Sequence, residues 1–473
     1  MAAFATDRLF GFALIMLITR WWSPTSVGHW TQLVALTGAF AVVTSLGLFQ
    51  AHVRFAAEST DPRVRKSLQL SIVFTTTLAM GVLTLVAMTA RHTVARWAFG
   101  SAEDATLVLA VCFLATSDLW MEFVTTQFRA QLHTGQTALV VAGKAVMRFV
   151  IVAVFAVRHE GGLSTIVALL AAVQALTAWL IMVTKFDGLT WLSVGFAPAA
   201  HLYRRAVAMA GPTIVAGVAA QLFVTAERWF LARTAPAMIA HYNVGLQIAS
   251  NAMLAYIILG SMLYPMMVRA WQAGDRQGAA ALQRDGIAVY ALTALPLLAI
   301  LPVISRAVVA VIATRYYEID GATMFLFLLG AFGFGIHQLA GYTMYVAERT
   351  TDLLLLLCGA ALVKVGLSAL LIPRWGEFAA ALSWGVSGVV LAIATVVRCH
   401  GLLPFEPAWR SLVRSAVVAL ACGSALAALT VYVDSGQEAA AVLGAGGVAV
   451  LIYLSFVWQD LQTALAFRRG QTG

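Results

Sequence analysis

The sequence predicts an all-α polytopic membrane protein with about fourteen transmembrane helices and an internal repeat. Of its 473 residues, 61% are hydrophobic and only 11% are charged, and the mean hydropathy is +0.87. Soluble globular chains carry about 25% charged residues, so a soluble fold is excluded. Hydrophobic runs follow one another along the whole chain, and a short motif recurs near its middle.

A spanning helix needs about 20 apolar residues. Runs of this kind lie at 5–22, 29–50, 67–90, 105–126, 137–157, 164–184, 206–226, 240–263, 286–305, 321–346, 354–372, 379–398, 411–433 and 439–458. No connecting segment exceeds about 20 residues, which is too short for a soluble domain. The first run is followed by Arg20-Trp21-Trp22 in place of a small-residue cleavage site, so we interpret it as a helix and not as a signal peptide.

The short motif occurs twice, about 210 residues apart. The first copy ends one hydrophobic run with Arg20-Trp21-Trp22 and opens the next with Gly28-His29-Trp30. The second copy reads Glu227-Arg228-Trp229-Phe230 and then Ala240-His241-Tyr242. Such a repeat indicates two related halves, which in membrane transporters usually face each other across a substrate site. The alternative is that Arg and aromatic residues collect at membrane interfaces without any repeat.

The charges outside the runs predict topology rather than a binding partner. The loops on one side of the membrane carry roughly twice as many Lys and Arg residues as those on the other, which predicts that both termini are cytoplasmic. The net charge of +9 comes from scattered Arg residues, so we expect no nucleic-acid partner. The cysteines form no CxxC motif and no His residues stand at metal-ligand spacing, so we expect neither a disulfide framework nor a metal site.

Two adjacent runs carry charges where apolar residues are expected. Lys144 and Arg148 stand one helical turn apart in one run, and Asp118 and Glu122 do so in the preceding run. The two runs form an antiparallel hairpin, so Asp118 and Lys144 should lie at similar depth and could pair, which would leave Arg148 without an obvious partner. One reading is a cationic cavity wall with Asp118 and Glu122 as coupling candidates for H⁺ or Na⁺. The other is a neutralised structural pair.

Further polar residues complete a candidate substrate site. Lys364 lies within a run with no carboxylate one turn away, so we expect it to face a cavity. The remaining candidates are Arg54, Arg228, Gln247 and His337, although each can also serve as an interhelical contact or an interfacial charge. Cations outnumber carboxylates in this set, which favours an anionic cargo. No cofactor is expected.

Several short motifs resemble one family. Arg20 and Gly28-His29-Trp30 are similar to the junction between helices one and two of the Wzx-type polysaccharide flippases, members of the multidrug/oligosaccharidyl-lipid/polysaccharide exporter superfamily. The same order of motifs continues with Gly47-Leu48 before Arg54, Phe128-Arg129-Ala130, Gly211-Pro212, Glu227-Arg228 in place of the family's Asp-Arg, Tyr264-Pro265 with Arg269 and Ala273-Gly274-Asp275, and finally Pro296 and Tyr316. Each motif is short, and their order is what is specific.

The resemblance implies two pseudo-symmetric six-helix lobes around a central cavity, at 1–205 and 206–398, with two C-terminal helices and a cytoplasmic tail in 399–473. It also implies that the protein moves undecaprenyl-pyrophosphate-linked oligosaccharide across the bacterial inner membrane by alternating access. Membrane lipids, and other polysaccharide assembly proteins, would be its partners. The protein would serve the synthesis of a surface polysaccharide and would not be an enzyme.

Two other functions are compatible with part of the sequence. A cation-coupled drug antiporter of the same superfamily would need more carboxylates within the first-half helices than Asp118 and Glu122 provide. A membrane-embedded glycan polymerase or ligase would need catalytic groups on a long external loop, and the external segments form no recognisable acid/base or nucleophile arrangement.

Overall fold

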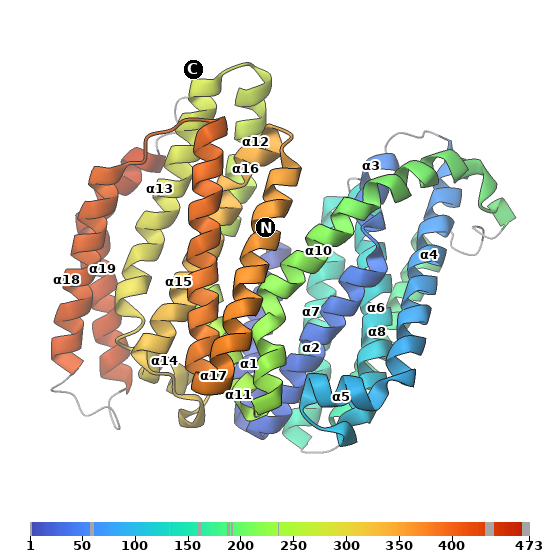
Figure 1. Cartoon of the computed structure of the whole chain (residues 1–473), viewed down its shortest axis with the longest axis horizontal. Helices are drawn as coiled ribbons and strands as arrows, with labels where there is room; N and C mark the ends of the chain where they lie inside the picture. Colours follow the sequence, from blue (N-terminus) through green and yellow to red (C-terminus); the bar gives the residue numbers. More distant parts are fainter. Residues whose placement is uncertain are drawn as a thin grey trace. The chain divides into compact units, whose positions relative to one another are not determined.

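The protein folds into α-helices throughout the part that the computed structural model describes, namely residues 2–56, 61–131, 133–158, 162–186, 190, 193–234, 236–430 and 439–465 (Figure 1). The chain divides into two compact units, Met1–Ala240 and His241–Gly473. The expected tail after residue 465 lies outside the described residues.

The first unit is built around one central helix. Its elements are α1 (Ala2–Trp21), α2 (Pro24–Ser45), α3 (Leu48–Ala56), α4 (Pro62–Thr89), α5 (Arg91–Phe99), η1 (Ala102–Asp104), α6 (Ala105–Ala130), α7 (Thr134–Arg158), α8 (Leu163–Phe186), η2 (Ala197–Ala199) and α10 (Ala200–Thr234). Helix α6 contacts α2, α3, α4, α7 and α8, and most of its side chains are buried. Charges placed on α6 are therefore held within a helical bundle.

The second unit has its tightest packing between α15 and α17. Its elements are α11 (Pro236–Ala252), α12 (Ala255–Gln272), α13 (Arg276–Ile300), α14 (Ser305–Ile312), η3 (Arg315–Tyr317), α15 (Gly321–Ala340), α16 (Tyr342–Val346), α17 (Thr350–Leu402), α18 (Trp409–Thr430) and α19 (Ala439–Leu465). A Cβ added to Gly333 would lie 2.5 Å from the carbonyl oxygen of Gly388, so the two backbones touch. Small residues permit this close approach.

The predicted hydrophobic runs coincide with helices. By length and composition, ten helices in the described ranges can cross a membrane, or up to twelve if each bent pair is one span. The difference from the predicted number has two sources. Helix α1 is not among the ten, and α17 counts once although it contains two predicted runs.

Helix α17 turns back at Gly376. A continuous helix of 53 residues would be about 80 Å long, more than twice the roughly 30 Å of a bilayer core. Gly376 has φ 54° and ψ −127°, a conformation that glycine adopts without a steric penalty. The helix is therefore two antiparallel spans joined by a tight turn, and Figure 1 shows its two halves side by side.

The predicted repeat is visible in the order of elements. Short helices follow α4 and α13, namely α5 with η1 and α14 with η3, before the long helices α6 and α15 begin. His29, in the first turns of α2, contacts the ring of Phe99 at the end of α5. His241, in the first turns of α11, contacts Tyr316 and Tyr317 in η3. The repeated histidine therefore has the same kind of neighbour within each unit.

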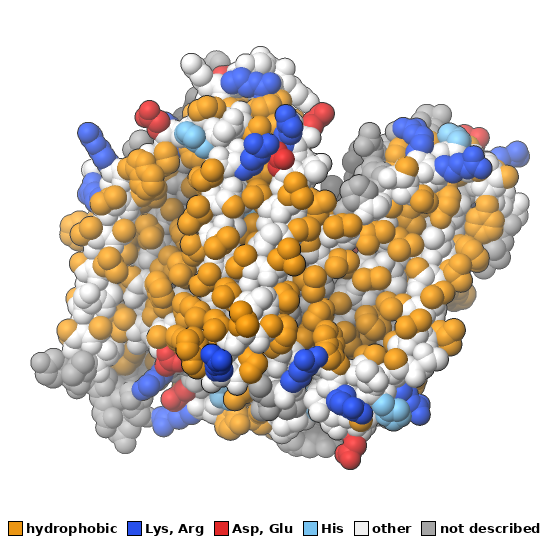
Figure 2. Space-filling model, in the orientation of Figure 1, with side chains coloured by type: hydrophobic (Ala, Val, Ile, Leu, Met, Phe, Trp, Pro, Cys, Tyr) orange, Lys and Arg blue, Asp and Glu red, His pale blue; other side chains and the backbone are white. Residues whose placement is uncertain are grey.

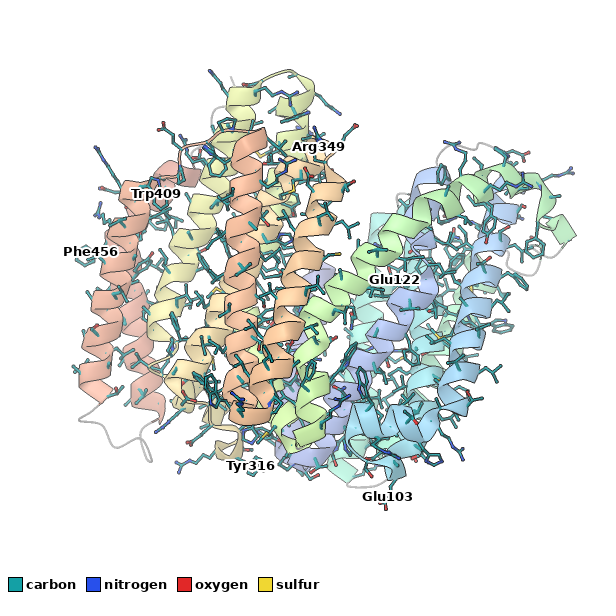
Figure 3. The ribbon with its side chains drawn as sticks, in the orientation of Figure 1. Glu103, Glu122, Tyr316, Arg349, Trp409 and Phe456 are labelled. Atoms are coloured by element: carbon teal, nitrogen blue, oxygen red, sulfur yellow. The ribbon has the colours of Figure 1, made fainter. Side chains whose placement is uncertain are left out.

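Each unit has an apolar flank between two polar ends. Figure 2 shows hydrophobic side chains along the flanks, with Lys, Arg, Asp and Glu gathered near the ends of the helices. In the second unit, Tyr316 and Arg349 mark opposite ends (Figure 3). This distribution matches a multi-pass membrane protein.

Candidate functional site

The charged cluster of the first unit is centred on Asp118 of α6. Its Oδ1 lies 2.7 Å from Lys144 Nζ, so the predicted pair is present. Its Oδ2 lies 3.6 Å from the guanidinium of Arg148. The expectation that Arg148 has no partner was therefore wrong, because one helical turn along α7 brings both cations to the same carboxylate.

This cluster retains an excess of positive charge. Two cations share one carboxylate, and the side chains of Lys144, Arg148 and Asp118 are 28%, 26% and 16% exposed. Among the described residues, Arg148 Nε has no hydrogen-bond partner. The cluster therefore offers a donor and a net positive charge to an anionic group, and a phosphate is the kind of ligand that such side chains bind.

Glu122 lies one turn further along α6 and contacts the guanidinium of Arg129. The two side chains are 51% and 42% exposed. The spacing of seven residues, about two helical turns, places Glu122 and Arg129 on the same face of the helix, so this pair could have been predicted from the sequence. Both coupling candidates, Asp118 and Glu122, are thus paired with cations in this structure.

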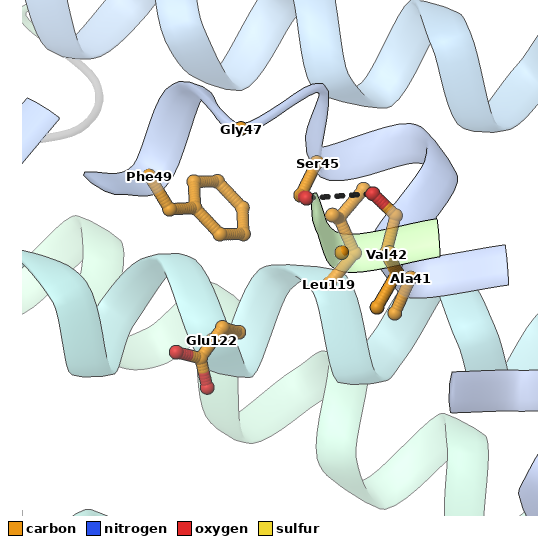
Figure 4. A pocket seen from close by; sticks show the side chains of 8 residues that line it. Ala41, Val42, Ser45, Gly47, Phe49, Leu119 and Glu122 are labelled. Carbon is orange, nitrogen blue, oxygen red and sulfur yellow. Dashed lines mark hydrogen bonds between the residues drawn. The ribbon is translucent and has the colours of Figure 1, made fainter. Parts of the chain in front are cut away.

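A cavity of about 260 Å³ adjoins Glu122 (Figure 4). It lies beside the break between α2 and α3, where Leu46 has φ 50° and Gly47 has φ 65°. Its lining is mostly apolar and comprises Ala41, Val42, Ser45, Gly47, Phe49, Leu119, Glu122 and Gly217. The sequence did not reveal this cavity, because helices far apart in the chain form it.

The other candidates of the first unit lie near the ends of their helices. Glu227 is fully buried near the end of α10, and Arg228 beside it is 8% exposed. Neighbouring aromatic rings cover this end, with Trp97 packed on Trp229. The side chain of Arg54 lies outside the described residues.

The candidates of the second unit are interior. Lys364 is fully buried, and its ammonium lies 4.2 Å from the centre of the Trp384 ring. His337 is 4% exposed, and its Nδ1 lies 2.8 Å from Thr395 Oγ1. Gln247 is partly exposed on α11. Because both Lys364 and His337 are buried, a ligand reaches them only after the surrounding helices rearrange, and their role in binding stays a prediction.

The family of this chain is shown by its sequence. The sequence matches the family described as polysaccharide biosynthesis protein over residues 1–271, which is more than half of the chain. The chain belongs to this family. The sequence-based resemblance to polysaccharide exporters is therefore confirmed at the level of the family. No curated protein matches the sequence significantly.

Solved structures show which fold this polysaccharide biosynthesis protein has. It is similar to the lipid II flippase MurJ in an inward closed conformation, with a TM-score of 0.75 at 13% identity, over 97% of this chain and 98% of the other. A multidrug resistance MATE family transporter of the MOP superfamily gives a TM-score of 0.67 at 12% identity, over 84% and 94%.

For a MOP superfamily transporter from Pyrococcus furiosus the TM-score is 0.56 at 13% identity, over 84% of this chain and 92% of the other. The chain thus has the polytopic fold seen in these flippase and transporter structures. All three of these structures are of flippases or transporters, and none is of an enzyme.

Proposed function

We propose that this protein flips undecaprenyl-pyrophosphate-linked oligosaccharide from the cytoplasmic to the periplasmic leaflet of the bacterial inner membrane by alternating access. The observation that carries the proposal is the cluster of two cations around Asp118, on a chain of the polysaccharide biosynthesis family. A pyrophosphate is the anionic part of every substrate in this class, whichever sugars it carries.

Asp118 has a defined role in this proposal. With no cargo bound, its carboxylate offsets part of the positive charge of Lys144 and Arg148 and lowers the energy of keeping them in an apolar bundle. A pyrophosphate that displaces Asp118 forms charge-assisted hydrogen bonds with the same donors. The carboxylate then repels the bound anion, which favours release once the protein opens to the other side.

The remaining candidates would contact the cargo at other stages of the transport cycle. Arg54, Arg228 and Gln247 would contact the polar head group as it passes, and Lys364 and His337 would do so only in a conformation that opens the second unit. Both termini lie in the cytoplasm in this proposal, the lipid tail stays among membrane lipids, and other polysaccharide assembly proteins supply and consume the substrate.

Mass spectrometry of the polyprenyl-lipid pool tests the proposal. Depletion of this protein in its native host should cause a complete oligosaccharide unit to accumulate on undecaprenyl pyrophosphate, with loss of the surface polymer. Re-expression of the wild-type protein should reverse both effects. An unchanged lipid pool contradicts the proposal and favours the MATE-like antiporter, for which the next measurement is drug susceptibility.

A further inference from the structure

A buried histidine lies in the first unit outside the charged cluster. His52 of α3 is 1% exposed and sits among apolar side chains of the unit's core, with its ring 6.1 Å from that of Phe123. Two buried amides accompany it. Gln69 Nε2 donates to Gln127 Oε1 at 2.8 Å, and the Gln127 side chain adjoins the imidazole.

The hydrogen-bonding capacity of this cluster is not met by the protein. Within the described ranges, the two ring nitrogens of His52 and Nε2 of Gln127 make no hydrogen bond of good geometry, although both side chains are only 1% exposed and the Gln127 side chain lies against the imidazole. Buried polar atoms are nearly always hydrogen-bonded. Buried polar groups without a hydrogen bond call for an explanation, and a proton-binding role is one.

Among the described residues, no carboxylate forms an ion pair with His52. Helix α3 packs against α4, α6 and α10. The described titratable groups at the same ends of these helices are Asp61, which caps α4, with Arg63, Arg65 and Lys66 on α4, the Glu122–Arg129 pair on α6, and His201, Arg204 and Arg205 on α10, with Arg205 over the ring of Phe55. Cations outnumber carboxylates in this set, and burial among apolar side chains adds to the cost of an imidazolium, which the Gln127 side chain offsets only in part.

The neutral form of His52 is favoured in this conformation for that reason. Helix α3 comes after the candidate membrane span Pro24–Ser45, so His52 lies outside the membrane-spanning segments. Burial lowers the pKa of His52 to about 4, and the Gln127 side chain offsets part of this effect. A histidine in contact with water has a pKa of about 6.5.

The helix is interrupted between α2 and α3. Leu46 and Gly47 both have positive φ, which interrupts the helix, and α3 is only nine residues long. The cavity beside Glu122 lies at the same break, so an adjacent space already exists. Displacement of α3 would expose His52 to water without unfolding α4 or α6.

We propose that His52 is the proton-binding site of the transport cycle. When α3 moves out, one proton from water binds an imidazole nitrogen, and the resulting imidazolium cannot return to the apolar cluster. The proton returns to water before α3 packs again. Each change of conformation is thus linked to one proton. This inference rests on the proposed transport function and names its coupling ion, while Asp118 and Glu122 stay paired with cations.

Hydrogen–deuterium exchange of the purified full-length protein in lipid nanodiscs tests the proposal. The measured quantity is the protection factor of amides in 48–55, corrected for intrinsic exchange rates, between pH 7.5 and pH 5. With pKa values of about 4 and about 6.5 for the two conformations, protection should fall about 25-fold. Constant protection in the wild type would overturn the proposal.

Two variants and a control assign the effect. His52→Gln should keep its protection constant over this pH range, whereas His133→Gln, an exposed histidine, should lose protection as the wild type does. An equal loss in His52→Gln would overturn the proposal. Gln127→Glu keeps His52 but places a carboxylate beside it, which raises the pKa in the packed conformation. The acid-induced loss should then be abolished or reversed, and wild-type behaviour of this variant would also count against the proposal.

The exchange experiment and the lipid-pool experiment fail independently. Normal pH-dependent exchange with an unchanged polyprenyl pool would retain the proton site and refute the flippase. Accumulation of the lipid-linked unit with exchange insensitive to His52 would retain the flippase and refute the proton site.

Discussion

At the scale of single residues, the ratio of charges around Asp118 determines what the first unit can bind. One carboxylate facing two cations leaves a net positive charge that is partly exposed. Isolated charges in a membrane helix cost about 2.5–3.5 kcal/mol on insertion scales, so pairing lowers the energy of keeping Lys144 and Arg148 between cargo molecules. The same pairing holds Asp118 between two cations, whereas none of the described carboxylates forms an ion pair with His52.

The buried carboxyl group of Glu377 makes the stability of the protein depend on pH. It adjoins the turn at Gly376, outside both predicted runs of α17. Burial, and then the charge of Asp320, raises the pKa of its carboxyl from 4.5 to about 7. Because ionisation is unfavourable in the folded state, stability is lost as the pH rises from about 4.5 to above 7.

Glu377→Gln should therefore unfold at a higher temperature than the wild type at pH 8, with a gain of about 1–3 kcal/mol, and at nearly the same temperature at pH 4.5. Thermal unfolding in detergent at both pH values measures this difference. Glu318→Gln, which removes an exposed carboxylate from the preceding loop, is the control and should show no such difference. A gain of equal size at both pH values for Glu377→Gln would contradict the assigned burial effect.

At the scale of helices, contact between backbones fixes the interior of the second unit. Gly330 and Gly333 of α15 face Gly388 of α17 so closely that a methyl group at any of these positions would overlap main-chain atoms. Lys364 and His337 are buried in the same unit. The ammonium of Lys364 packs on the ring of Trp384, and the imidazole of His337 is hydrogen-bonded to Thr395. The packing therefore determines whether these two side chains can reach a ligand.

Gly333→Ala should destabilise the second unit by about 1–3 kcal/mol, because the added methyl group must push two backbones apart. Thermal unfolding followed by circular dichroism measures the change. Gly359→Ala, where nothing lies within 4 Å of the added methyl group, serves as the matched helical control and should be neutral or slightly stabilising. Equal stability of the Gly333→Ala variant and the wild type would show that α15 and α17 approach less closely than described.

At the scale of the whole molecule, the transport proposal predicts separate effects on activity and on folding. Lys144→Gln combined with Arg148→Gln removes the cationic donors while Asp118 keeps polar neighbours. Surface polymer in a depleted host complemented with this variant should fall at least about tenfold, a loss of the order of one charge-assisted hydrogen bond or more, while the amount of protein stays the same. Arg158→Gln, an exposed cation at the end of the same helix, should restore full export.

The polymer measurement must be paired with quantification of the protein in the membrane. Normal export by the double variant would remove Lys144 and Arg148 from the substrate path. Loss of export by Arg158→Gln to the same extent would indicate a general requirement for positive charge on α7.

The sequence by itself determined the membrane-spanning helices, the repeat and the pairing of Asp118 with Lys144. These follow from local patterns, since hydrophobicity over about 20 residues defines a span and a turn of 3.6 residues places charges on one face. Only the tertiary structure decided that Arg148 shares Asp118, that Lys364 packs on Trp384, and that His52 is enclosed with Gln127. Each of these depends on which helix packs against which, and contacts between residues far apart in the chain leave no periodic signal in it.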